Sequence, residues 1–133
     1  MTSRLAVLVI DALEPPRIAE FWCEVLGWQV AAVDDADMSI GPADGTSPTI
    51  DVCRVRKRKK GKDWLHLDLR AAGVPTEVEL PRLLDLGATR VDVGRSNDAT
   101  WLVLADPEGH ESCLLSRSAQ ELPEEGRDPA DRG

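Results

Sequence analysis

Residues 63–70 alternate between two kinds of side chain without interruption, in the order Asp-Trp-Leu-His-Leu-Asp-Leu-Arg. Because successive side chains of a β-strand point to opposite faces, this period of two predicts a strand with one face on an apolar core. The leucines form that face, and the opposite face carries a row of polar and aromatic residues: Trp64, His66, Asp68 and Arg70. Solvent-facing strands rarely carry such a set, whereas pocket walls often do, so the pattern predicts a small-molecule pocket.

Hydrophobic periodicity and turn residues predict two units with the same order of elements, a strand, a helix and three strands. The first unit is expected at residues 5–10, 15–26, 28–33, 38–40 and 49–55. The second is expected at residues 63–71, 74–86, 88–93, 99–104 and 111–115. Leu-Gly pairs close both helices, and the apolar run at 5–10 predicts a buried strand. One βαβββ unit alone would leave a sheet face uncovered, so two must assemble, within one chain or across a homodimer.

Pro81 lies inside the second predicted helix and leaves two alternatives open. Either the helix begins late, near Leu80, or it is kinked at the proline. Trp22 and Trp28 keep the spacing of packed residues, and we expect both in the core.

Chain length and composition narrow the class of protein. A chain of 133 residues is most simply one domain, which we place at residues 1–116, with modules at about 4–56 and 63–116. The polar, acidic stretch 117–133 predicts a disordered tail. No apolar run approaches the roughly 20 residues that span a bilayer, so we expect a cytoplasmic protein without a membrane partner. The three cysteines form no CxxC pair, so no disulfide framework is predicted.

A basic run at residues 56–62 has two interpretations. It could contact nucleic-acid phosphates, or it could be a solvated hairpin between two strands. The net charge of −8 favours the hairpin, because binding to nucleic acid needs a positive field. We therefore expect no nucleic-acid partner.

Three stretches carry a family resemblance: Phe21–Trp28 (FWCEVLGW), Leu65–Leu69 (LHLDL) and Leu104–Cys113 (LADPEGHESC). With the double βαβββ pattern, they make the chain resemble the vicinal oxygen chelate superfamily, and more narrowly the glyoxalase-like (glyoxalase/bleomycin resistance) domain. The resemblance extends to about Leu115. It implies an α+β fold in which two βαβββ modules form a cup-shaped mixed sheet around a ligand, with helices on the outer face. It also implies a divalent metal, held in many members by inward His and Glu residues on four strands.

Carried across position by position, this resemblance implies only part of the usual metal site. His66 stands at a metal-ligand histidine, whereas Cys113 stands where metal-bearing members have Glu. The fourth-strand position falls on Asp51 or Cys53, and the first-strand candidates at 5–9 are all apolar. The usual metal is therefore expected to be lost or changed. We expect no cofactor; the alternatives are a divalent metal at His66, or zinc held by His66, Cys53 and Cys113.

His66 and Asp68 are the candidate catalytic residues. An imidazole titrates near neutral pH, and a carboxylate two residues away on the same face could orient it or move a proton. Asp68 could equally form an ion pair with Arg70 at the strand end. The remaining candidates, expected to contact a ligand, are Trp64, Asp51, Cys53, Trp101, Cys113 and Arg70. His110 follows a predicted turn at 106–109 and is expected to be a surface turn residue rather than a ligand.

Two functions remain open at this point. The first is a glyoxalase-like protein that binds a small organic molecule inside the cup without a metal, for sequestration or resistance. The second is an enzyme of the lyase or isomerase type that uses His66 and Asp68 as acid and base, with or without a divalent metal. In both, we expect a homodimer.

Overall fold

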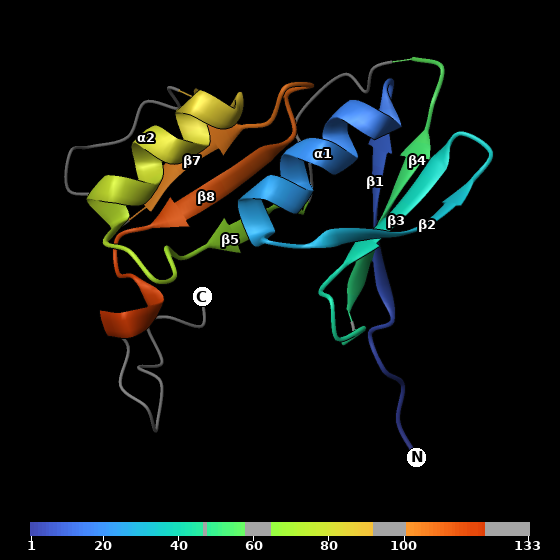
Figure 1. Ribbon diagram of the computed structural model, residues 1–133, viewed down its shortest axis with the longest axis horizontal. Coiled ribbons are helices and arrows are strands. Elements are labelled where there is room, and N and C mark those ends of the chain that lie inside the picture. Colours follow the sequence, from blue (N-terminus) through green and yellow to red (C-terminus); the bar gives the residue numbers. More distant parts are fainter. Residues whose placement is uncertain (47, 58–64, 92–100, 122–133) are drawn as a thin grey trace. The chain divides into compact units, whose positions relative to one another are not determined.

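The computed structural model describes residues 1–46, 48–57, 65–91 and 101–121, apart from the side chain of Trp101. The chain divides into two compact units, Met1–Lys62 and Asp63–Gly133 (Figure 1). Each unit has its own four-stranded mixed sheet and one α-helix. This arrangement confirms the α+β class and the predicted pair of βαβββ modules. The cup is a relation between the two units and stays a prediction.

The first unit follows the predicted order of elements. These are β1 (Val7–Ala12), α1 (Pro15–Leu26), β2 (Gln29–Asp34), β3 (Asp37–Gly41) and β4 (Thr49–Arg54). The strand order in its sheet is β1-β4-β3-β2, with β1 parallel to β4 and the other pairs antiparallel. The first and last strands of the unit are therefore neighbours.

Helix α1 forms where its end signals and its apolar stripe predict it. Prolines occupy its first turn, where a missing amide donor costs little, and Gly27 ends it with a left-handed φ of 68°. Its buried residues meet the apolar face of the first sheet in a core made of Ala12, Ile18, Ala19, Phe21, Trp22, Ile40, Ile50 and Val52. The core position of Trp22 is confirmed, whereas Trp28 is only partly buried.

The prediction of a buried strand at residues 5–10 was wrong about its burial. β1 begins at Val7, and its residues alternate between exposed and partly buried positions. Val9 is 59% exposed. The physical reason is that α1 covers one face of this sheet, so only every second residue of the apolar run is packed beneath the helix.

The second unit repeats this plan with shorter strands. Its elements are β5 (Leu67–Leu69), α2 (Thr76–Leu86), β6 (Thr89–Arg90), β7 (Trp101–Ala105), β8 (Glu111–Leu115) and a short 3-10 helix, η1 (Ala119–Glu121). The strand order is β5-β8-β7-β6, with β5 parallel to β8. Helix α2 lies along this sheet (Figure 1) and contains Pro81, so the alternative of a late start near Leu80 is excluded.

The strand expected at 63–71 is shorter than its alternation suggested. β5 spans three residues, and Leu65 lies before it with 83% of its surface exposed. Leu65 therefore does not belong to the apolar face, because it has no partner strand to hold it there. Leu67 and Leu69 keep their predicted place and are partly buried.

The start of the predicted tail is folded against the second unit. The amide of Ala119 donates to the carbonyl of Ala71 over 2.8 Å, and Ser118 is buried. The rest of the tail, residues 122–133, lies outside the described residues, as do 58–62 of the basic run; Arg56 and Lys57 are exposed. No helix in the described part of the chain is long and apolar enough to cross a bilayer.

Candidate functional site

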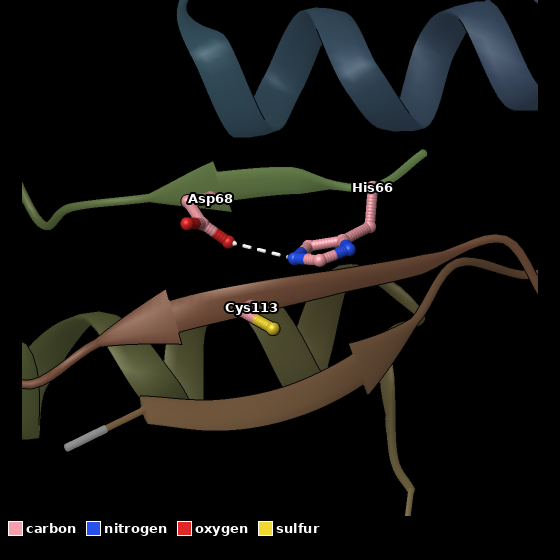
Figure 2. A group of neighbouring side chains, drawn as sticks. All are labelled: His66, Asp68 and Cys113. Carbon is pink, nitrogen blue, oxygen red and sulfur yellow. Dashed lines mark ion pairs between the residues drawn. The ribbon is translucent and has the colours of Figure 1, made fainter. Parts of the chain in front are cut away.

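The pairing of β5 with β8 assembles the candidate site. In this parallel pair, Asp68 is the register partner of Cys113, and Leu67 is the partner of Ser112. Side chains at alternate positions share a face, so His66, Asp68 and Cys113 gather on the face opposite to the leucines. Figure 2 shows the three side chains beside one another. Asp68 comes from β5, His66 from the residue just before β5, and Cys113 from β8.

The polar atoms of these three residues are close together. His66 Nε2 lies 3.2 Å from Asp68 Oδ1 (Figure 2). The three ligand atoms (one imidazole nitrogen, one carboxylate oxygen and the Cys113 sulfur) lie within 4.8 Å of one another. The pairing of β5 with β8 thus brings together groups from the first and last strands of the unit. The prediction that His66 and Asp68 share a face is consistent with this contact.

Burial divides the cluster into an open part and a closed part. The side chains of His66 and Asp68 are 52% and 35% exposed, whereas Cys113 is buried. Solvent can therefore reach the imidazole and the carboxylate, with the thiol beneath them at the sheet. Such an arrangement can accept hydrogen bonds from a ligand, donate one from the imidazole, or coordinate a cation.

Arg70 is used in the fold of the second unit. Its Nη1 donates to the carbonyl oxygen of Arg117 over 2.9 Å and so ties the end of β5 to the chain after β8. This contact gives Arg70 a structural role that its strand pattern did not reveal. Trp64 and the side chain of Trp101 lie outside the described residues, so both stay predictions as ligand contacts.

Asp51 and Cys53 belong to the first unit, on one face of β4. The Ser39 hydroxyl donates to Asp51 Oδ1 over 2.7 Å. Partial burial, followed by the carboxylates of Asp37, Asp51 and Asp11, raises the pKa of the Cys53 thiol. Cys53 is therefore a weak nucleophile near neutral pH, because the thiolate is the reactive form. A zinc trio that includes Cys53 would join the two units and stays a prediction.

His110 has a buried partner that the sequence reading missed. Its Nδ1 lies 2.7 Å from Asp106 Oδ2, and the other Asp106 oxygen accepts the amides of Glu108 and His110 over 2.9 and 3.0 Å. The short side chain of Asp106 thereby closes the turn between β7 and β8. His110 therefore follows the turn as predicted, but its side chain is only 24% exposed and does not lie on the surface. The sequence contained a signal for this contact, because the aspartate that begins the Asp-Pro-Glu-Gly turn stands four residues before the histidine.

The usual metal site of the resembled family does not fit these residues. It requires His and Glu donors on four strands, yet Val7 and Val9 on β1 carry no side-chain donor, the carboxylate of β1 is at Asp11 near its end, and the last strand presents Cys113. Oxygen and nitrogen donors in octahedral number are what hard divalent cations need. The first strand supplies none at these positions, so no step of a reaction is assigned to that metal.

Comparison with known proteins bears on the fold as a whole. A sequence profile described as "Glyoxalase-like domain" matches residues 7–115. A search of curated proteins gives no significant match.

Several solved structures share the fold at low sequence identity. The fosfomycin resistance protein FosX from Mesorhizobium loti is 12% identical, with a TM-score of 0.66 over 91% of this chain and 97% of that one. A glyoxalase/bleomycin resistance protein/dioxygenase family enzyme from Burkholderia phytofirmans PsJN is 16% identical, with a TM-score of 0.62 over 84% and 97%. The oxidase ChaP-H2 is 20% identical, with a TM-score of 0.61 over 88% and 95%.

Proposed function

Since the chain belongs to the glyoxalase-like domain family, we propose that it binds a small organic molecule on the open face of its second sheet. The single observation that carries this proposal is the contact of 3.2 Å between His66 Nε2 and Asp68 Oδ1 on that face. A pocket needs a few convergent polar groups that fix the orientation of a ligand, and this pair meets the requirement.

The similar structures include one named for fosfomycin resistance and one named an oxidase. Because proteins of this fold serve such different purposes, the fold alone does not distinguish sequestration from catalysis. The distinction must be argued from the residues of the site. We favour binding, because the described polar groups of the site are one imidazole and one carboxylate in contact above a buried thiol, a small set that can hold a ligand by hydrogen bonds.

Ligand-detected NMR on the full chain, with a library of small carboxylates, phenols and amides, tests the binding proposal. Hits should shift the amide signals of His66, Asp68 and Cys113 in isotope-labelled protein. Asp68→Asn should weaken these hits about tenfold or more, since a lost charged hydrogen-bond partner is worth roughly 1.5–3 kcal/mol. Asp85→Asn is the matched control, because it removes an exposed carboxylate on α2 of the same unit. Hits that bind equally to both variants would contradict the proposal.

Lyase or isomerase chemistry is the second candidate function, and the same contact supports it. A carboxylate 3.2 Å from an imidazole can orient the ring for transfer of a proton. Incubating each bound hit in deuterated water would reveal carbon-bound protons that the protein exchanges. Exchange that stops in His66→Ala would support the enzyme, and binding without any exchange or product would contradict it.

We also propose that the chain forms a homodimer and works in the cytoplasm, as its sequence predicts. Light scattering during size-exclusion chromatography tests the first point. A mass equal to one chain at micromolar concentration would contradict it.

A further inference from the structure

We propose that the outer edge of β2 is a docking surface for a second copy of this chain. The two β2 strands pair antiparallel about a two-fold axis between Ala31 and Ala32 and join the first-unit sheets of two chains. The inference rests on the homodimer proposed above and names the surface that forms it. It concerns the first unit alone and does not depend on ligand binding at His66.

The outer edge of β2 is uncovered in the part of the chain that the structure describes. β2 is an edge strand of the first sheet (Figure 1), and all six of its residues are exposed. Such a strand presents unpaired N–H and C=O groups that another strand can bind. The edge strands of the second sheet are much shorter, with three residues in β5 and two in β6. They offer far less backbone for pairing.

The composition of β2 leaves its edge open to pairing. Natural proteins protect long edge strands with lysine, proline or inward-pointing charges. β2 reads Gln-Val-Ala-Ala-Val-Asp, so its single charge stands at the last residue. Val30 and Val33 are 44% and 64% exposed. Pairing with a second β2 would remove part of this apolar surface from water, which favours association.

A β-bulge makes this edge symmetric. Val30 is the register partner of Ile40 and Val33 is the partner of Met38, and the register shifts between them. Ile40 and Met38 stand two residues apart on β3 and therefore share a face, so both valines lie on one face as well. In a regular strand, residues three positions apart would point to opposite faces. A bulge often protects an edge by twisting it, but a two-fold partner carries the same bulge at the same place.

The sequence of β2 is complementary to itself when two copies run antiparallel. Each Val30 then stands opposite Val33 of the second copy, and each Gln29 stands opposite Asp34. The alanines of both copies meet at the axis, where their small side chains let the bulged backbones approach. A slip of one residue in either direction would set a valine against Gln29 or Asp34. The aligned register is therefore the one that pairs valine with valine.

The charges at this edge favour the same register. The side-chain amide of Gln29 can donate a hydrogen bond to the carboxylate of Asp34 opposite to it. The two Asp34 residues stand at opposite ends of the paired strands, four steps of β3 apart, or about 13 Å at roughly 3.3 Å per residue. This separation exceeds the Debye length of about 8 Å at physiological ionic strength. Repulsion between the two carboxylates is therefore largely screened.

The other edge of the first sheet lacks this symmetry. β1 also has six residues, but a two-fold pairing centred on Val9 or Ile10 would set the carboxylate of Asp11 against a valine. Val9 is 59% exposed, close to the value for Val33. It therefore provides a matched control, an exposed valine on the opposite edge strand of the same sheet.

Sedimentation velocity of the full chain over a dilution series tests the surface. The wild type should be a dimer at micromolar concentration. Val33→Lys places a charge on the paired edge and should raise the dissociation constant of the dimer tenfold or more. Val9→Lys adds the same charge to the chain on the other edge strand and should leave the dissociation constant unchanged. Both positions are exposed, and circular dichroism checks that each variant keeps its fold.

A disulfide between two variants tests the register. Val30→Cys and Val33→Cys, mixed under a mild oxidant, should form a disulfide between their introduced cysteines, because these positions face each other in the dimer. Neither variant alone should form a link between introduced cysteines. Peptide mass spectrometry identifies the linked residues and separates them from the three native cysteines.

The outcomes keep this inference distinct from the proposals on which it rests. A dimer that Val33→Lys leaves intact, or that Val9→Lys weakens equally, would overturn the β2 surface and leave the homodimer in place. A mixture of the two cysteine variants without the expected link would also overturn it. A monomer at every concentration would overturn the homodimer together with its surface. Species larger than a dimer would contradict a closed two-fold pair. Ligand hits at His66 should be unchanged in Val33→Lys, and their loss would contradict the independence of the two surfaces.

Discussion

Asp68 and Cys113 are register partners in the parallel pair of β5 and β8, although these are the first and last strands of the second unit. The relationship follows from the βαβββ plan, in which the first and last strands of a unit become neighbours. Asp11 and Cys53 hold the same relationship in the first unit. The two units thus share an Asp–Cys pair, and the imidazole of His66 distinguishes the second.

The Cys53 thiol should react slowly with iodoacetamide at neutral pH, and its rate should increase as the pH rises into the alkaline range. Its pKa is raised by partial burial and then by neighbouring carboxylates, Asp37 first among them, so little thiolate is present. Asp37→Asn should speed the reaction severalfold, because it removes a negative charge while keeping an oxygen to accept the amide of Arg54. Peptide mass spectrometry after timed alkylation measures the rate.

Cys23 is the internal control for this experiment. Burial and then Glu24 raise the pKa of its thiol, with no contribution from Asp37. Its alkylation rate should therefore be the same in wild type and Asp37→Asn. If both cysteines accelerate together, the substitution has loosened the first unit rather than changed the charge around Cys53.

Local patterns in the sequence predicted those features that depend on neighbouring residues. The period of 3.6 and the Gly27 cap predicted α1, and the period of two predicted that His66 and Asp68 lie on the same face of the chain. The family resemblance predicted that Cys113 lies on the same face as His66. The register of β5 and β8, which pairs Cys113 with Asp68, agrees with this prediction. These predictions depended only on the order of the secondary-structure elements and on the alternation of side chains along each strand.

Features that depend on distant partners were not predictable in the same way. The Arg70 side chain reaches the carbonyl of Arg117, and nothing near Arg70 in the sequence indicates that acceptor. Likewise, the alternation in the sequence starts at residue 63 and includes Leu65, but β5 begins only at Leu67, where its pairing with β8 begins. Strand length is decided by the partner strand, so periodicity alone overestimates it.

Gly41→Ala should destabilise the first unit through one steric contact. A Cβ at Gly41 would lie 2.9 Å from Cγ2 of Thr49, and the branched threonine side chain has little freedom to move away. Overpacking of this kind costs roughly 1–3 kcal/mol. Thr49→Ser removes the clashing methyl group, so the same glycine substitution should be milder in that background. Urea unfolding of the four proteins measures the coupling, and additive effects would contradict the clash.

Asp106→Ala should be among the most destabilising polar substitutions in the second unit. The buried carboxylate accepts two backbone amides and contacts His110 Nδ1, so alanine would leave buried donors without their acceptor. We expect a loss of about 2–4 kcal/mol in the free energy of unfolding. Asp106→Asn keeps one acceptor oxygen and should lose less. Asp44→Ala is the matched control, because Asp44 holds Thr46 in a similar turn at an exposed position and should change stability little. Equal losses for Asp106→Ala and Asp44→Ala in urea unfolding would mean that burial of the carboxylate does not set the effect.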